Sequence, residues 1–239
     1  FESVHGWRSV CDLCRLMTMK DGSVVRKEKR QIPTLEFEDA CWGQGFEHIA
    51  GVDEAGRGPL AGPVVAAAVI LPKGVSIEGV NDSKKLSAKQ RETLFHDIYE
   101  RALSIGVGIV SHEVIDRINI YQASILAMRK AIEKLAFAPS IVLADGNSFK
   151  HESWRYQNII DGDAKSITIA AASVVAKVTR DSLMREYHTQ FPLYGFDRHK
   201  GYGTKFHMEA LQRYGMCPIH RRSFHLHRRA ESQTGVMPG

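Results

Sequence analysis

The sequence predicts a mixed α/β fold, in which a central β-sheet is flanked by helices. Apolar runs with the character of strands come early in the chain, at residues 49–52, 64–71 and 103–110. Segments with helical periodicity dominate later and enclose one further short apolar run at residues 141–144. Strands followed by helices that alternate with single strands are typical of a sheet with helices packed on its faces.

The first two strands are expected to form a hairpin. The run at residues 49–52 leads into Asp53 and Glu54 and then into a turn rich in Gly and Pro, after which the run at 64–71 begins. The run at 103–110 supplies a third strand. The short apolar run at 141–144 is expected to be a buried strand that delivers Asp145 at its end.

Three helices are expected. Ser87 can act as the N-cap of a helix that continues to Arg101. Residues 121–136 place their apolar side chains on one stripe, and Pro139 ends this second helix. The third helix, at residues 164–187, is rich in Ala, and such small side chains would let it lie close to a sheet.

The chain is expected to contain one large folded domain. Residues 1–45 mix charges, Cys and Gly without periodicity, which indicates a poorly ordered N-terminal extension. Residues 46–225 form the domain, including a helical C-terminal part, and residues 226–239 are a tail. Cys11 and Cys14 have the spacing of zinc ligands, but because no second pair follows at a suitable distance we expect no structural zinc there.

The composition indicates a soluble protein with an anionic partner. The longest apolar run is too short to span a bilayer, and the first residues do not resemble a signal peptide, so we expect a cytoplasmic location. We also expect the protein to be a monomer. The net charge is +5 and the pI is near 9.0. This charge by itself favours a nucleic acid only weakly. Basic side chains are concentrated toward the C-terminus, at Arg198, Lys200, Lys205, Arg213, Arg221, Arg222, Arg228 and Arg229.

Four acids stand at the ends of predicted elements. Asp53 and Glu54 follow the first strand, Asp145 follows a later strand, and Asp163 opens the long helix. The carboxyl ends of strands in open α/β sheets are where ligands bind. A cluster of carboxylates without histidine suits Mg²⁺ or Mn²⁺, and two such ions can hydrolyse a phosphodiester. Spacing alone equally permits ordinary cap and turn acids.

The wording of several segments resembles one enzyme family. Residues 51–63, Gly-Val-Asp-Glu-Ala-Gly-Arg-Gly-Pro-Leu-Ala-Gly-Pro, are similar to the opening signature of ribonuclease HII, the type 2 ribonuclease H. Similarity to this family extends over about residues 46–225. Further blocks in the order of the family begin at Asn81, Asp145, Gly162, Ala170, Ala176, His199 and Cys217.

This resemblance implies a ribonuclease H-like fold and an endoribonuclease. The enzyme would hydrolyse the RNA strand of RNA–DNA hybrids and incise at single ribonucleotides in duplex DNA, leaving a 3′-hydroxyl and a 5′-phosphate. Asp53, Glu54, Asp145 and Asp163 would be the catalytic acids that hold Mn²⁺ or Mg²⁺. Because neighbouring residues of a regular strand point to opposite faces, the chain is expected to bend at Asp53 and Glu54.

The resemblance also implies how substrate is recognised. Gly56, Arg57 and Gly58 would contact the 2′-hydroxyl and the neighbouring phosphate through their backbone, and the two glycines can supply the expected bend. Tyr202 would stack beside the sugar at the RNA–DNA junction. Further phosphate or sugar contacts are expected from Ser83, Lys84, Lys165, Ser166, Lys177 and Arg180. The histidines at positions 199, 220, 225 and 227 are interpreted as exposed residues of a basic tail.

Three other functions are compatible with parts of the pattern. A nucleic-acid-binding module could keep the fold without chemistry, although the intact acids argue against it. Ribonuclease HIII resembles this family but carries a large N-terminal substrate-binding domain and lacks the Gly-Arg-Gly sequence, which is present here at residues 56–58. A ribonuclease H-like exonuclease or transposase would share the acids, but not the glycine segment or Tyr202.

Overall fold

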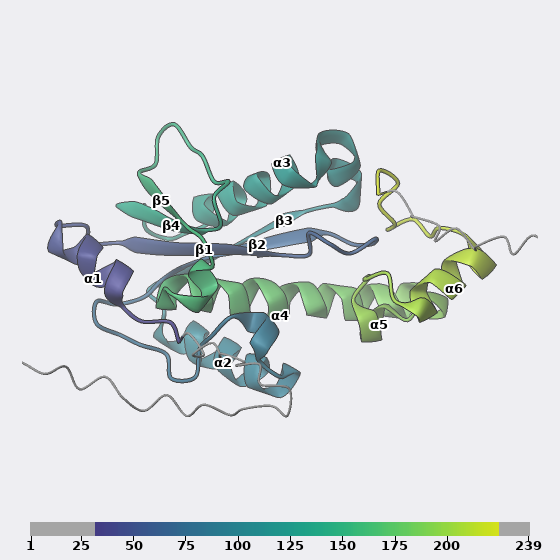
Figure 1. Cartoon of the computed structure of the whole chain (residues 1–239), viewed down its shortest axis with the longest axis horizontal. Coiled ribbons are helices and arrows are strands. Elements are labelled where there is room, and N and C mark those ends of the chain that lie inside the picture. Colours follow the sequence, from purple (N-terminus) through teal and green to yellow (C-terminus); the bar gives the residue numbers. More distant parts are fainter. Residues whose placement is uncertain (1–31, 225–239) are drawn as a thin grey trace, which may run out of the picture. The chain divides into compact units, whose positions relative to one another are not determined.

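The computed structural model describes residues 32–224. Its strands form a mixed five-stranded sheet in the order β3-β2-β1-β4-β5 (Figure 1). The first three strands pair antiparallel, whereas β1, β4 and β5 are parallel. The strands are β1 (Ile49–Ala55), β2 (Val64–Ile70), β3 (Ser104–Val110), β4 (Ile141–Asp145) and β5 (Tyr156–Ile159).

The predicted mixed α/β class, the β1–β2 hairpin and the strands β3 and β4 are therefore confirmed. The edge strand β5 is not expected from the sequence, because its side chains are mostly polar or exposed and show no buried apolar run. The strand β1 is longer than expected and includes Asp53 and Glu54.

The helices agree with the prediction in position and differ at their ends. Ser87 caps α2 (Ala88–Arg101) in a reciprocal capping box with Gln90. The helix α3 (His112–Glu133) begins earlier than expected and is interrupted at Asn119, whose backbone has φ +66°. The long helix α4 (Ile167–Gln190) starts three residues later than expected because Ser166, not Asp163, is its N-cap.

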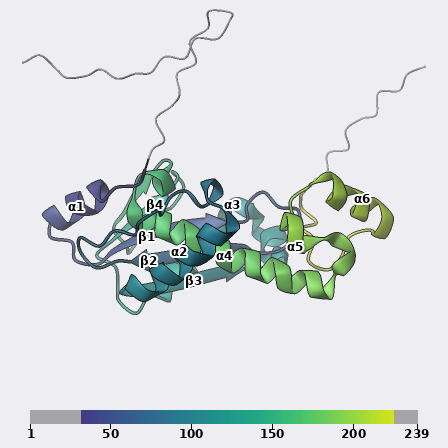
Figure 2. The ribbon, with the colours of Figure 1, turned by 90° about the horizontal axis from the view of Figure 1, so that it is seen from below.

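Helices cover both faces of the sheet. The helix α3 packs on one face, and α4 packs on the other with α2 beside it (Figures 1 and 2). The expected close approach of α4 is confirmed at Gly51 of β1, where a Cβ atom would lie 2.2 Å from the backbone carbon of Thr168. Buried Ala170, Ala171 and Ala172 continue this contact. Within residues 32–224, none of the helices combines the length and apolar character needed to cross a membrane.

The C-terminal part is helical, as expected. It follows α4 and comprises the 3₁₀ turn η3 (Pro192–Tyr194) and the helices α5 (Phe196–His199) and α6 (Lys205–Tyr214). Two further 3₁₀ turns lie earlier in the chain, at η1 (Ser83–Lys85) and η2 (Gly162–Ala164). The loop between β1 and β2 packs against this part, because the amide of Leu60 donates to the carbonyl of Gly201 and that of Gly62 donates to the carbonyl of Ile219.

A helix precedes the sheet in the region expected to be an extension. The helix α1 (Glu36–Gly43) places the buried carboxylate of Glu38 at the start of α4. Its Oε1 accepts from the Ser166 hydroxyl at 2.6 Å and from the Thr168 hydroxyl and amide at 2.7 and 3.0 Å. Cys11 and Cys14 lie outside the described residues.

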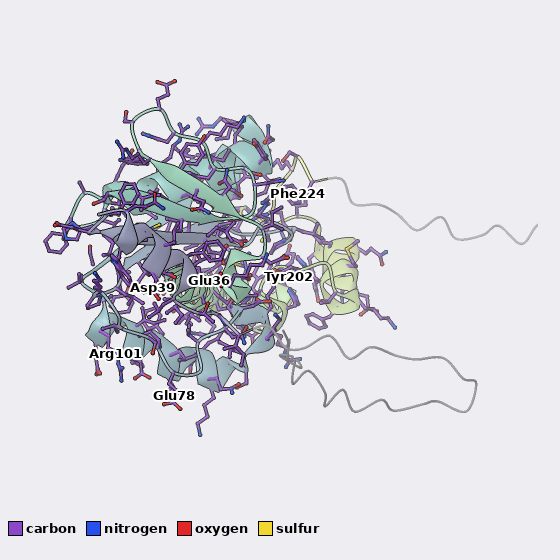
Figure 3. All side chains as sticks on the ribbon, turned by 60° about the vertical axis from the view of Figure 1, so that its left-hand side comes forward. Glu36, Asp39, Glu78, Arg101, Tyr202 and Phe224 are labelled. Carbon is purple, nitrogen blue, oxygen red and sulfur yellow. The ribbon has the colours of Figure 1, made fainter. Side chains whose placement is uncertain are left out.

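We expect Glu38→Ala to lower the free energy of unfolding by about 2–4 kcal/mol, because it leaves buried donors of Ser166 and Thr168 without an acceptor. The measurement is urea denaturation followed by circular dichroism. Glu36→Ala removes an exposed carboxylate from the same helix and serves as control (Figure 3). Equal unfolding midpoints for the two variants would contradict this role of Glu38.

Candidate active site

Asp53 and Glu54 lie on opposite sides of one strand. The strand β1 keeps an unbroken register with β2, in which Asp53 faces Ala67, Glu54 faces Ala66 and Ala55 faces Val65. The expected bend at the two acids is therefore wrong, and the chain first departs from the strand at Gly56, with φ +99°. Regular alternation consequently directs the two carboxylates to different faces.

Each of these two acids has its own surroundings. Asp53 is buried, with 4% of its surface exposed, and the Ser173 hydroxyl of α4 lies close enough to lower its pKa in part. Glu54 lines a small cleft against α3, together with Asp145, and its Oε1 lies 3.0 Å from Nη1 of Arg57. Asp53 and Glu54 therefore lie near the end of β1 on opposite faces of the sheet.

Asp145 and Asp163 are brought together by one hydrogen bond. Asp145 ends β4, and its Oδ1 accepts from the amide of Gly162 at 2.7 Å. Gly162 opens the 3₁₀ turn η2, which carries the buried Asp163. Two acids that are 18 positions apart in the chain therefore meet beside the end of β1.

The four acids repel one another electrostatically. Burial raises the pKa of Asp53 well above its ordinary value, and the charges of Glu54 and Asp145 add to the shift. Burial also raises the pKa of Glu54, although Arg57 opposes this. Burial, with the charges of Asp82 and Asp145, raises the pKa of Asp163 to about 6. The cluster is therefore short of positive charge.

Lys84 and Asp82 modify this cluster. Partial burial acts to lower the pKa of Lys84, but the carboxylates of Asp163 and Asp82 raise it overall. Its Nζ lies 3.6 Å from Oδ2 of Asp163. Asp82 is a further acid at this cluster that was not predicted as a site residue. Its position in a charged Asn-Asp-Ser-Lys-Lys segment is the signal that could have indicated it.

The glycine segment after β1 is held by two buried arginines. The Arg221 guanidinium donates to the carbonyls of Gly56 and Arg57, at 2.6 and 3.0 Å, and also to those of Gly62 and Pro63. Arg180 donates to the carbonyls of Pro63, Ala61 and Lys200. Arg57 and Gly58 themselves stay exposed. The turn therefore has a fixed backbone and an open outer surface.

Tyr202 stands opposite this turn. Its side chain is 45% exposed, and a Cβ atom added at Gly58 would lie 3.5 Å from its Cε1. Figure 3 shows Tyr202 where the C-terminal helices meet the rest of the fold. The structure therefore brings Gly58 and Tyr202 together, as expected from the sequence.

Three of the other predicted substrate contacts are placed differently. Arg180 and Ser166 have 0% exposure and Ser83 has 4%, so their side chains are packed inside the protein and are not accessible to a ligand. Arg180 binds backbone carbonyls, Ser166 caps α4, and the Ser83 hydroxyl accepts from that of Ser173. A direct substrate contact by these side chains conflicts with their burial.

The remaining predicted contacts are three lysines. The Lys165 ammonium donates to the carbonyl of Ile160 at 2.6 Å, and Lys177 pairs with Asp181 at 2.7 Å. Lys84 is exposed and lies at the acid cluster. Of these three lysines, only Lys84 is in contact with one of the four acids.

The chain is similar to known proteins of one family. The family model described as Ribonuclease HII matches residues 50–227. The ribonuclease HII of Enterococcus faecalis is 56% identical over 189 residues, which cover 79% of this chain and 74% of that protein. The ribonuclease HII of Acholeplasma laidlawii is 57% identical over 193 residues, which cover 81% of this chain and 95% of that protein.

Solved structures show the same fold. Ribonuclease H2 from Pyrococcus horikoshii OT3 matches with a TM-score of 0.62 and 28% identity, over 74% of this chain and 93% of that one. The PCNA:RNase HII complex from Archaeoglobus fulgidus contains a chain that matches with a TM-score of 0.64 and 26% identity, over 77% of this chain and 98% of that one. The chain therefore belongs to the ribonuclease HII family and is an endoribonuclease with a ribonuclease H-like fold.

Proposed function

We propose that this enzyme hydrolyses the RNA strand of RNA–DNA hybrids and incises duplex DNA at single ribonucleotides. The observation that carries the proposal is the position of the four-acid cluster. It lies at the end of β1, directly before an exposed glycine turn that faces Tyr202. Phosphodiester chemistry and sugar recognition can therefore take place at adjacent points of one surface.

The acid cluster fits divalent metal ions. Its ligand atoms are carboxylate oxygens, which Mg²⁺ and Mn²⁺ prefer. Burial and mutual repulsion raise the pKa of Asp53, Glu54 and Asp163, so added positive charge would stabilise their ionised forms. Within residues 32–224, no three Asp, Glu, His or Cys side chains stand in positions to coordinate one ion, so binding a metal would require the carboxylates of this cluster to move toward one another. We assign Asp53, Glu54, Asp145 and Asp163 as the ligands.

When bound, two such ions would stabilise the charge on the phosphoryl group and on the leaving oxygen. The residues of the chain do the rest. Buried Gly56 lets the chain turn, and the exposed backbone of Arg57 and Gly58 can be approached by a ribose, with no Cβ atom at Gly58 in the way. Tyr202 offers an exposed ring on which the junction sugar can rest. Lys84 adds a cation next to Asp163, at the place where a phosphate would approach. Hydrolysis would leave a 3′-hydroxyl and a 5′-phosphate.

The proposal is tested with duplex DNA that contains one ribonucleotide, an all-DNA duplex and an RNA–DNA hybrid. Cleavage of the first and third is expected with Mn²⁺ or Mg²⁺ and is expected to stop with EDTA. Tyr202→Ala is expected to lower kcat/KM at the single ribonucleotide by about tenfold to a hundredfold, because a stacking contact is lost. Tyr99→Ala removes an equally exposed tyrosine from α2 and is the control.

Two results would contradict the proposal. Equal cleavage of the all-DNA duplex would show that the 2′-hydroxyl is not checked. Metal-independent binding of the ribonucleotide duplex without cleavage would instead support a catalytically inactive binding module. Binding and cleavage are therefore measured on the same preparations of protein.

A further inference from the structure

Two buried histidines lie behind Tyr202. His207 of α6 has 0% exposure and His220 has 2%, and their Nε2 atoms are 3.0 Å apart. The expectation that His220 is an exposed tail residue is wrong, because it is packed against the rings of Tyr194 and Phe196. His225 and His227 lie outside the described residues. A buried pair of polar side chains requires a complete set of hydrogen bonds.

The backbone determines the direction of these hydrogen bonds. The amide of Cys217, which can only donate, lies 2.9 Å from Nδ1 of His220, closer than the carbonyl oxygen of the same residue at 3.2 Å. At the other end, Nδ1 of His207 is 2.9 Å from the carbonyl oxygen of Tyr202, which can only accept. A neutral His207 that donates from Nδ1 to Tyr202 must accept at Nε2, so His220 donates from its own Nε2 and accepts at Nδ1 from the Cys217 amide. This chain of hydrogen bonds runs from the Cys217 amide through both imidazoles and ends at the backbone carbonyl of Tyr202.

Arg221, the residue after His220, binds the glycine turn that faces Tyr202. Arg221 binds the carbonyls of Gly56 and Arg57. The backbone of His220 and Arg221 also pairs with the loop between β1 and β2. Ala61 and His220 form an isolated antiparallel β-bridge, and the amide of Arg221 donates to the carbonyl of Leu60. The dipeptide His220-Arg221 is therefore connected to both sides of the expected ribose site, to the turn through Arg221 and to Tyr202 through His207.

We propose that His220 and Arg221 act together as a positioning element that sets Tyr202 against the Gly56–Gly58 turn, with His207 as the link to Tyr202. This inference rests on the proposed function, in which the turn and Tyr202 recognise the ribonucleotide. Neither histidine touches substrate. A displacement of Tyr202 by as little as about 1 Å would reduce productive alignment of the substrate.

The link requires both imidazoles to be neutral. A proton on Nε2 of His207 would place two N–H groups face to face across 3.0 Å. Burial lowers the pKa of His207 to about 4 and also lowers the pKa of His220. The titratable groups that face the pair are His199, whose ring stacks on His207, Cys217, and His112, whose charge reaches His220. The link is thus complete at neutral pH.

Two substitutions at His207 separate its two hydrogen bonds. His207→Gln places a side-chain amide near the Nε2 position, so it can keep the bond to His220 but loses the carbonyl of Tyr202. His207→Asn places its amide near the Nδ1 position and can still donate to that carbonyl. We expect His207→Gln to lower kcat/KM at a single ribonucleotide by about tenfold, and His207→Asn to recover most of this loss. Leu211→Ala opens the same buried cluster without touching either bond and controls for lost packing.

The double variant with Tyr202→Ala distinguishes positioning from general destabilisation. If His207 acts through Tyr202, His207→Gln has no further effect in the Tyr202→Ala background. Loss of equal size in both backgrounds overturns the inference but leaves the proposed function intact. If Tyr202→Ala itself leaves kcat/KM unchanged, it is the proposed recognition by Tyr202 that fails.

A second measurement needs no variant, and decides the matter if His207→Gln does not fold. In ¹⁵N NMR spectra of the wild-type protein at pH 7, we expect neutral His207 protonated on Nδ1 and neutral His220 protonated on Nε2. A charged imidazole at either position, or the opposite tautomer, would overturn the link to Tyr202.

Discussion

Asp145→Asn is expected to lower the rate of cleavage at a single ribonucleotide on the order of a thousandfold, or about 4 kcal/mol in activation free energy. The substitution keeps an oxygen that can accept from the Gly162 amide, so the turn that carries Asp163 keeps its hydrogen bond. It removes one negative charge from a cluster in which Asp145 raises the pKa of Asp53, Glu54 and Asp163. The loss therefore falls on metal binding and chemistry, not on folding.

The matched control is Asp39→Asn, the same change at an exposed acid of α1 (Figure 3). Its activity and its unfolding midpoint are expected to equal those of the wild type. Isothermal titration with Mn²⁺ would show weaker binding for Asp145→Asn alone. Full activity of Asp145→Asn would remove Asp145 from the catalytic site.

Gly56→Ala is expected to be the most damaging single-methyl change in the site. The added Cβ would lie 2.0 Å from Nε of Arg180 and 2.9 Å from the carbonyl oxygen of Pro63, and the backbone φ of +99° is unfavourable for any L side chain. We expect about 3–5 kcal/mol of lost stability and about a hundredfold loss of activity, because the turn must move away from Tyr202.

Gly74→Ala separates the two causes of this effect. Gly74 has a similar φ of +75°, but no atom lies within 4 Å of an added Cβ. It is expected to cost about 1 kcal/mol from backbone strain alone, with unchanged activity. Thermal unfolding and kcat/KM are measured for both variants, and equal losses would show that Arg180 is not the obstacle.

Much of the fold can be predicted from local patterns. The apolar runs before Asp53 and after Pro63 indicate the hairpin, and Ser87 ahead of a segment with helical periodicity indicates the start of a helix. These signals are local, because burial on a strand or helix repeats with the period of that element. The catalytic acids and the glycine turn can also be predicted, because each lies within a short contiguous motif of the sequence.

The tertiary structure decided which polar residues face substrate and which hold the site. Arg180 has the charge expected of a phosphate contact, yet it is buried and bound to carbonyls from the β1–β2 loop. Glu38 and Ser166 are 128 positions apart, and Arg221 is 165 positions from Gly56. A buried polar side chain must find its partners wherever the fold brings them. The sequence by itself determined the elements and the chemical groups of this protein; only the folded structure decided the partners of its buried polar groups, because those contacts join segments distant in the chain.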